Sequence, residues 1–209
     1  MKKNFILIFL FIISNALIVW GADETIAIIN AKIYTMNGAP IENGVLILKG
    51  GKIEDVGTGI QTRAGARVIN ASGKTVLPGF IDSNCHIGLE EVNQVKATVD
   101  DSEATDPVTP QLSVIDAFYP DSKTIGVTRS NGITAGIVAP ADENIFTGMS
   151  AIVEFSGNRL DQIVLKSPSA LHVTLGEAPK ATYGHRNKIP STRMGSAYLL
   201  RETFQKAKE

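Results

Sequence analysis

The first part of the chain, residues 25–75, alternates short hydrophobic runs with polar turns, which is typical of short β-strands. Two of these runs, residues 45–48 and 52–56, flank the pair Gly50-Gly51. Because both glycines can adopt positive φ without a steric penalty from Cβ, the pattern predicts a two-residue hairpin. We expect four short antiparallel strands in a thin β layer, with Val68-Ile69 in the last of them. The apolar face of such a layer needs further strands or another layer to cover it.

The pattern changes at Val76, where residues 76–82 form a mostly apolar run. Such a run predicts a strand buried on both faces, and residues 133–138 predict a second one. Between them, acids clustered over residues 100–106 and several prolines predict a long loop. A short helix is expected over residues 122–129, because Asn131-Gly132 follows it as a stop signal.

The last part of the chain predicts two more strands, at residues 152–155 and 170–175, and then an amphipathic helix. Ser191, directly after Pro190, is the expected N-cap of this helix. Its apolar positions recur at spacings of three and four and predict one buried stripe, which consists of Met194, Ala197, Leu200, Phe204 and Ala207.

The N-terminus has the pattern of a secretory signal peptide rather than of a folded segment. Lys2-Lys3 precede an apolar run over residues 5–19, and small or short residues at Val19 and Gly21 fit a cleavage site after Gly21. We therefore expect residues 1–21 to be removed and the protein to be exported, most simply to the periplasm, without a stable membrane anchor. The alternative is an uncleaved anchor, although the apolar run is shorter than the roughly 20 residues that span a bilayer.

Composition excludes several classes of protein. Lys and Arg total 20 and Asp and Glu total 21, so no basic excess exists to neutralise phosphates, and a dedicated nucleic-acid binder is not expected. The single cysteine excludes a disulfide framework and a multi-cysteine zinc module within the chain. Neither a P-loop nor a G-x-G-x-x-G motif occurs, so a nucleotide cofactor has no support.

Ligand-capable side chains follow the first buried strand. Side chains alternate along a strand, so Asp82, Asn84 and His86 share one face while Ser83 and Cys85 point to the other. At the carboxyl end of a barrel strand, His86 could give a neutral imidazole nitrogen to a divalent metal. A lone His at a strand end is more often a hydrogen-bonded structural residue, and both interpretations stay open.

The segment from Pro78 to Leu89 resembles the entry to the barrel of the metal-dependent amidohydrolase superfamily, in its exported, imidazolonepropionase-like branch. The resemblance continues in Ser130-Asn131-Gly132-Ile133-Thr134, in Ala139-Pro140, and in residues 190–195 ahead of the last helix. It implies an α/β fold, in which a small β-sandwich lies beside a (β/α)8 TIM-like barrel. It also implies one or two metal ions, most simply zinc, that activate a water for attack on a C–N bond of a small-molecule amide or cyclic amide.

Two features depart from the family pattern. The family has His-x-His at the end of the first barrel strand, where this chain has Asn84-Cys85-His86. The second His corresponds to His86, while the neutral oxygen of Asn84 is a weaker zinc ligand than imidazole. The part of the chain from Val76 to Glu209, 134 residues, is also shorter than the roughly 200 residues of a complete barrel. We therefore expect a partial β-sandwich over residues 22–75 and about three or four βα units of the barrel over residues 76–209.

Other candidate residues have two possible roles each. Asp82 could orient a metal ligand by accepting a hydrogen bond from it, or it could make a purely structural hydrogen bond. His172 could line the substrate pocket or be a satisfied core residue, and Arg193 could bind a substrate carboxylate or be exposed at a helix start. Cys85 is expected to be buried.

We expect the N-terminal part of an exported, metal-dependent amidohydrolase, which would lack turnover by itself because no residue of this chain matches the general base. The alternative is a non-catalytic periplasmic binding or scaffold protein on a decayed barrel, with Asn84 marking the lost site. A third possibility is an oligomer that covers exposed sheet edges.

Overall fold

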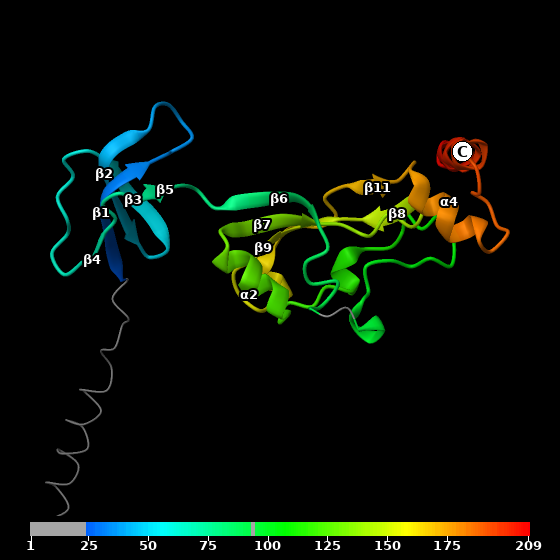
Figure 1. Ribbon diagram of the computed structural model, residues 1–209, viewed down its shortest axis with the longest axis horizontal. Coiled ribbons are helices and arrows are strands. Elements are labelled where there is room, and N and C mark those ends of the chain that lie inside the picture. The colour runs from blue at the N-terminus through cyan, green and yellow to red at the C-terminus, as the bar shows by residue number, and fades with distance from the viewer. Residues whose placement is uncertain (1–23, 93–94) are drawn as a thin grey trace, which may run out of the picture. The chain divides into compact units, whose positions relative to one another are not determined.

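The computed structural model describes residues 24–92 and 95–209, and the predicted signal peptide, residues 1–21, lies outside the described residues. The chain divides into two compact units, Met1–Pro78 (unit 1) and Gly79–Glu209 (unit 2) (Figure 1). Each is described by itself below. None of the helices in the described ranges has the length and apolar character needed to cross a membrane.

Unit 1 is a five-stranded sheet in the order β3-β2-β1-β4, with β5 also paired to β1. Its strands are β1 (Thr25–Ile33), β2 (Ile41–Lys49), β3 (Lys52–Gly57), β4 (Arg67–Asn70) and β5 (Thr75–Val76). The predicted hairpin is confirmed: Gly50 and Gly51 have φ of 55° and 73°, and they connect the antiparallel strands β2 and β3. The core of this unit contains Ala31, Ile33, Leu46 and Ala71.

The prediction that all four strands of this layer are antiparallel is wrong for β4, and the sheet contains a fifth strand, β5, that was not expected. Both run parallel to β1, with Ile26 opposite Arg67 and Lys32 opposite Thr75. The reason is the connection after β3. Residues 58–66 lead the chain back to the end of the sheet where β3 began, so that β4 runs in the same direction as β1.

Unit 2 is a mixed α/β unit with one four-stranded sheet, in the order β10-β9-β7-β6, and a separate pair, β11-β8. Its elements are β6 (Phe80–Cys85), two 3₁₀ turns (Lys96–Thr98 and Val114–Asp116), α2 (Lys123–Ser130), β7 (Ile133–Val138), β8 (Phe146–Met149), β9 (Ala151–Glu154), α3 (Leu160–Ile163), β10 (Val164–Lys166), β11 (Leu171–Val173), α4 (Glu177–Gly184) and α5 (Arg193–Lys206). The helix predicted over residues 122–129 and the strand predicted over residues 133–138 are confirmed as α2 and β7, and the predicted long loop precedes them.

Only one βα unit is present in the described residues, where about three or four were expected. The strands β6 and β7 run parallel and are connected through α2, as in a barrel (Figure 1). After β7, however, β9 and β10 run antiparallel to their neighbours. A parallel crossover needs a dozen or more residues, and the connection from β9 to β10 is shorter than that. The closed barrel therefore stays a prediction.

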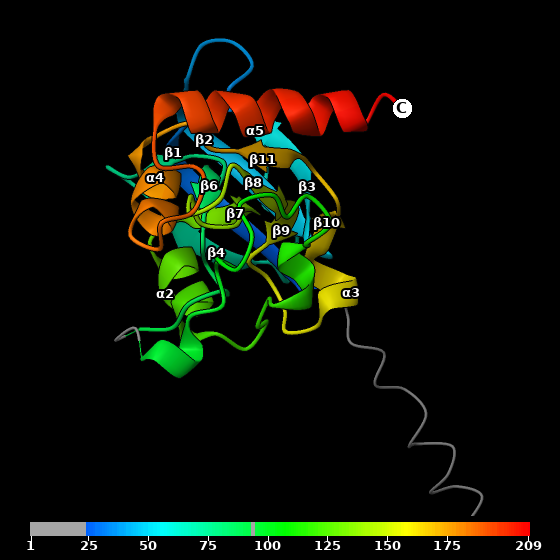
Figure 2. The same ribbon diagram turned by 90° about the vertical axis from the view of Figure 1, so that its right-hand side faces the viewer.

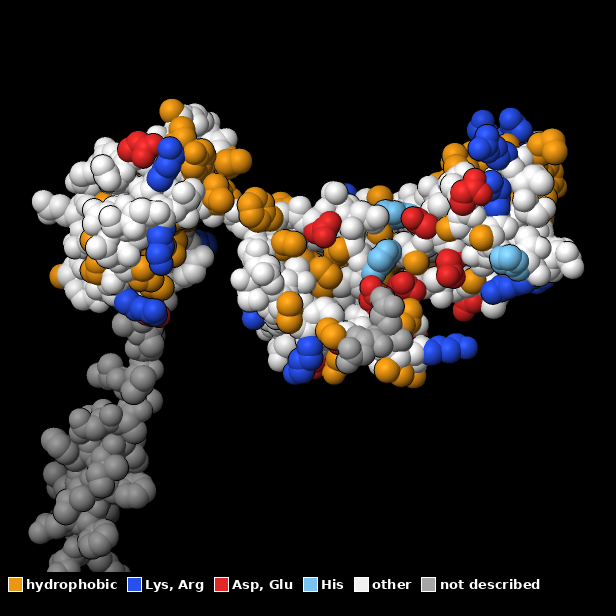
Figure 3. Space-filling view, in the orientation of Figure 1, with side chains coloured by type: hydrophobic (Ala, Val, Ile, Leu, Met, Phe, Trp, Pro, Cys, Tyr) orange, Lys and Arg blue, Asp and Glu red, His pale blue; other side chains and the backbone are white. Residues whose placement is uncertain are grey.

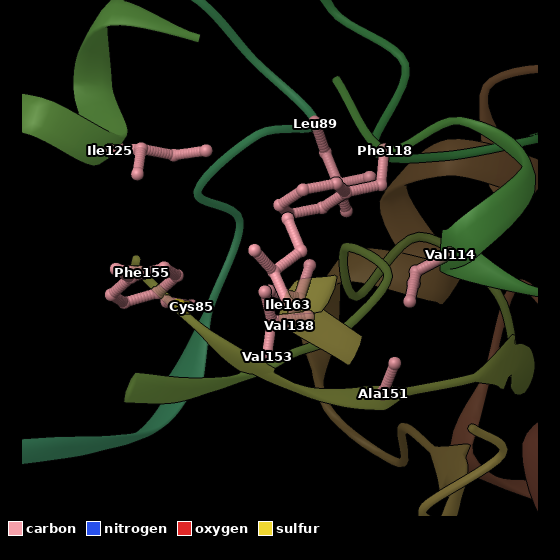
Figure 4. Packing of buried hydrophobic residues seen from close by; sticks show 10 residues of the cluster. All are labelled: Cys85, Leu89, Val114, Phe118, Ile125, Val138, Ala151, Val153, Phe155 and Ile163. Carbon is pink, nitrogen blue, oxygen red and sulfur yellow. The ribbon is translucent and has the colours of Figure 1, made fainter. Parts of the chain in front are cut away.

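The core of unit 2 lies between this sheet and the segments that cover it, and Figure 4 shows its side chains. Leu89, Val114 and Phe118, from the loop segments, meet Ile125 of α2 and the inward residues of β7 and β9 (Figure 4). Val138, Val153 and Phe155 are at most 1% exposed. Cys85 is buried at 8% exposure, as predicted.

The strand β6 is not buried on both faces, which corrects the prediction made from its apolar sequence. Phe80 and Ile81 are 60% and 71% exposed. The physical reason is that β6 is an edge strand, paired only with β7 within the described sheet. Its apolar side chains are therefore covered on one side at most.

The helix α5 also differs from its prediction in two details. Its N-cap is Thr192, whose side-chain oxygen accepts from the backbone N–H of Gly195 at 3.2 Å, and not Ser191. The buried face contains Ser196 and Leu199, whereas Met194 is 80% exposed. Because Leu199 packs on Ile145 and Phe146, the contact with the preceding strand region sets the buried face. Figure 2 shows α5 as one continuous helix, with α4 close to its start.

Candidate functional site

The site is built around His86, the first residue after β6. Its Nδ1 lies 2.9 Å from the backbone carbonyl oxygen of Ala139, the first residue after β7, and the ring is partly buried. The backbone N–H of Ala139 in turn donates to the carbonyl of Cys85 at 2.9 Å, so the carboxyl ends of the two parallel strands are joined. A carbonyl oxygen only accepts hydrogen bonds, so the neutral ring carries its proton on Nδ1. Nε2 then holds the free lone pair, which is the arrangement of a metal-binding histidine.

The two polar residues upstream of His86 on β6 are placed differently. Asn84 is exposed and Asp82 is partly buried. The Asp82 carboxylate accepts from the backbone N–H of Asn84 at 3.1 Å. The group that holds the His86 ring is therefore the Ala139 carbonyl, whereas the role of Asp82 behind a metal ligand stays a prediction.

His172 lies on β11, opposite Gly148 of the antiparallel strand β8. Its Nε2 atom is buried and has no hydrogen-bond partner in the described structure. Burial lowers the pKa of His172, and nearby His86 lowers it further, while Asp142 acts in the opposite direction. The ring is thus kept neutral near neutral pH, and it lies within electrostatic range of His86.

Acidic side chains lie within electrostatic range of His86. Burial raises the pKa of Asp101, as do Glu90 and Glu143, while His86 opposes the rise. Figure 3 shows His side chains among acidic side chains on this face of unit 2. A pocket of about 260 Å³ opens beside them, with Asp101 and Pro140 in its lining. His172 and Asp101 thus each lie within electrostatic range of His86, and the sequence predicted only the two histidines as site residues.

The fit of these residues to a metal ion is partial. His86 has the hydrogen bond and the free Nε2 of a single metal ligand. Across residues 24–92 and 95–209, however, no three His, Cys, Asp or Glu side chains form a group that could hold a metal ion. The described residues therefore provide one well-oriented ligand and not a complete site.

Arg193 is the first residue of α5, and it is exposed. The pKa of Glu177 is lowered mainly by its hydrogen bond with Lys180, and Arg193 contributes a smaller part. Arg193 thus lies near the acidic start of α4, and its binding to a substrate carboxylate stays a prediction. His185 is exposed, directly after α4.

Sequence analysis missed the residue that holds His86 in place. Ala139 acts through its backbone carbonyl, and a backbone group leaves no trace in residue type. The pair Ala139-Pro140 marks only the end of the strand. Asp142, whose charge acts on the pKa of His172, comes from the same turn and has no local pattern that distinguishes it from a surface acid.

Comparisons with known proteins identify several relatives of this chain. No family model matches the chain. The chain is 27% identical over 155 residues to the amidohydrolase tasK of Hapsidospora irregularis, which covers 69% of this chain and 16% of that protein. It is 37% identical over 93 residues to the N-substituted formamide deformylase of Arthrobacter pascens, covering 43% of this chain and 16% of that protein.

A solved structure gives the fold comparison. The amidohydrolase of Thermotoga maritima MSB8 matches with a TM-score of 0.80 and 34% identity, over 88% of this chain and 47% of that one. The chain therefore spans about half the length of that structure, and a smaller share, 16%, of each of the two relatives above. The shared fold and the sequence similarity to several amidohydrolases lead to one conclusion: this chain belongs to the metal-dependent amidohydrolase superfamily.

Proposed function

We propose that this chain is part of a hydrolase that acts on a C–N bond of a small-molecule amide or cyclic amide. The observation that carries the proposal is the His86 ring, bound through Nδ1 to Ala139 with Nε2 free, at the strand end where α/β barrels place their chemistry. The names of its relatives support the class of reaction, since they include an amidohydrolase, a formamide deformylase and a 5'-deoxyadenosine deaminase.

In this proposal His86 is one ligand of a divalent metal, most simply zinc, and Asn84 is a weaker ligand beside it. A metal bound there would supply a water of lowered pKa as the nucleophile. His172 lines the substrate pocket, and its neutral ring can donate or accept a hydrogen bond to an amide. Arg193 is the candidate for a substrate carboxylate, through its guanidinium group.

The remaining ligands and the general base would come from residues outside this chain, because the chain spans 47% of the matching amidohydrolase structure. We also propose that the protein is exported to the periplasm, on the strength of the apolar run after Lys2-Lys3. N-terminal sequencing of the secreted protein tests this: a new terminus after Gly21 supports export, and an intact Met1 in the cytoplasmic fraction contradicts it.

The test of the metal proposal is the zinc content of the protein, purified without chelators. We expect bound zinc in the parent protein, its loss in His86→Asn, and no change in His185→Asn, a matched control at an exposed position. Equal zinc content in all three proteins, or none in the parent, would contradict the role of His86.

A second function is favoured by one observation. Asn84 replaces the first His of the family pattern and is exposed rather than directed into a closed site. A non-catalytic binding or scaffold protein would follow from this. Hydrolysis of a panel of N-formyl amides and cyclic amides by the full-length protein, with the residues that this proposal places outside the chain, distinguishes the two functions. Turnover that is lost in His86→Asn supports the hydrolase, and binding without turnover supports the scaffold.

A further inference from the structure

A largely buried polar network lies next to the candidate site and joins three segments that are distant in sequence. Its centre is Asn144, at 2% exposure. The Asn144 Nδ2 donates to the Glu103 carbonyl and to Thr109 Oγ1, both at 2.8 Å. Its Oδ1 accepts from the Tyr183 hydroxyl of α4 at 2.5 Å. Since the Glu103 carbonyl can only accept, the amide has one possible orientation.

Each member of this network is satisfied. Thr109 Oγ1 donates onward to the Phe146 carbonyl at 2.9 Å, and Thr109 and Tyr183 are 4% and 0% exposed. Burial raises the pKa of Tyr183 to about 12, so its hydroxyl stays protonated and remains a donor. Arg186 donates to the Ala104 carbonyl and lies over the Tyr183 ring. The network therefore has a unique arrangement, and removal of one hydroxyl leaves a buried partner without its bond.

The network fixes the turn of residues 139–145 against the loop of residues 101–109. Besides the Asn144 bonds, the backbone N–H of Ala141 donates to the Asp101 carbonyl at 2.8 Å, and Ser102 Oγ donates to Glu143 at 2.6 Å. The backbone N–H of Ile145 donates to the Pro107 carbonyl at 2.9 Å. Of the side chains that join the two segments, the amide of Asn144 is buried most deeply, whereas the Ser102–Glu143 pair is only partly buried.

The turn begins at Ala139, whose carbonyl holds His86, and it contains Asp142, whose charge acts on the pKa of His172. The loop on the other side starts with Asp101, which lies within electrostatic range of His86. Residues 139–143 contain no helix or strand, so their path depends on the hydrogen bonds of Ala141 and Glu143 and on the bonds at the two ends of the segment. One end is fixed by the Ala139–Cys85 backbone bond and the other by Asn144.

We propose that Asn144, held by Tyr183 and Thr109, is a positioning residue that fixes the Ala139 carbonyl and thereby keeps His86 in the tautomer with Nε2 free. This inference rests on the proposed function, in which Nε2 of His86 is the reactive atom. Asn144 acts through the backbone and touches neither metal nor substrate.

The experiment compares the parent with Tyr183→Phe and Thr109→Val, which each remove one hydroxyl of the network and preserve the shape of the side chain. Tyr198→Phe is the matched control, because its hydroxyl bonds to Glu202 on the exposed side of α5. The measurement is the ¹⁵N chemical shift of both ring nitrogens of His86 in the full chain, at about pH 8. Circular dichroism shows that each variant is folded, and Thr109→Val serves as the second variant if Tyr183→Phe does not fold.

We expect one protonated and one unprotonated nitrogen in the parent and in Tyr198→Phe. In the two network variants we expect shifts that average between the two tautomers. Unchanged His86 shifts in a folded network variant, even with a lower melting temperature, would show a purely structural role and overturn the inference. A parent ring that carries its proton on Nε2 would instead contradict the proposed function, so the two failures are distinguishable.

Discussion

Replacement of Gly136 by Ala tests the packing between β6, β7 and the core of unit 2. A Cβ added at Gly136 would lie 3.0 Å from Sγ of Cys85 and 3.0 Å from Cζ of Phe155. Both neighbours are buried, at 8% and 1% exposure. Neither side chain can move away without displacing other core residues. Because Cys85 directly precedes His86, a shift of its sulfur would also disturb the site.

The magnitude follows from two opposing effects. Overpacking of a tight core costs about 1–3 kcal/mol. The smaller entropy of the unfolded chain on going from Gly to Ala returns about 0.4–1 kcal/mol. We therefore expect Gly136→Ala to lower the free energy of unfolding by about 1–2 kcal/mol.

The matched control is Gly126→Ala on α2, where no atom lies within 4 Å of the added Cβ. It should raise the free energy of unfolding by about 0.5–1 kcal/mol, because Ala is the better helix former.

The assay is pulsed hydrogen exchange with mass spectrometry along a urea titration, read on peptides that cover β7 and β9. These peptides report the unfolding of unit 2 separately from that of unit 1, which is necessary because two compact units need not unfold together. The urea concentration at the unfolding midpoint should fall for Gly136→Ala and rise for Gly126→Ala. The dependence of the unfolding free energy on urea concentration should not change. A Gly136→Ala midpoint equal to or above that of the parent would refute the packing of Cys85 and Phe155 on this glycine.

Two further predictions concern His172 and the hairpin. Burial lowers the folded pKa of His172 below its unfolded value, so the unfolded state binds more protons, and the free energy of unfolding should fall as the pH drops below about 6.5. The free energy of unfolding, measured by urea titration at several pH values, should fall less at low pH in His172→Gln than in the parent, and as much as in the parent in His185→Gln. The same pH dependence in all three proteins would contradict the lowered pKa of His172. Gly51→Val should destabilise unit 1 by about 1–2 kcal/mol, because Gly51 has φ of 73° and its surroundings are open, so that the backbone conformation alone is strained. Gly51→Asn should destabilise unit 1 less than Gly51→Val, because Asn adopts positive φ more readily. Equal losses of unfolding free energy in the two variants, measured by hydrogen exchange of peptides from β2 and β3, would show that the positive φ is not the cause.

Local signals in the sequence predicted local structure well. The Gly50-Gly51 pair gave the hairpin, because positive φ is a property of the two residues themselves. Ser122 caps α2 by accepting from the backbone N–H of Thr124 at 3.2 Å, and the helix ends at Asn131-Gly132 as expected. These features depend on contacts within a few residues, which a sequence pattern contains.

Long-range arrangement was predicted less well. The direction of β4 and the antiparallel course of β9 depend on the loops between strands, whose path the hydrophobic pattern does not encode. The buried face of α5 is set by contact of Leu199 with Phe146, far away in sequence. Tertiary contacts of this kind override a weak helical periodicity.

The candidate site shows the same division. His86 follows a recognisable strand end, and its place was predicted from the residues around it. Its partner is a backbone carbonyl, and the network behind that carbonyl joins Asn144 to Tyr183 across 39 residues. Asn144 and Tyr183 are ordinary residues in their local sequence, so only the folded structure identifies them.

The most direct test of the account is the position of a bound zinc ion relative to His86, measured by anomalous diffraction at the zinc edge on the purified protein. The account predicts zinc at about 2.0–2.1 Å from Nε2 of His86, with Nδ1 still bonded to the Ala139 carbonyl. Zinc bound through Nδ1, or zinc located away from His86, would contradict it.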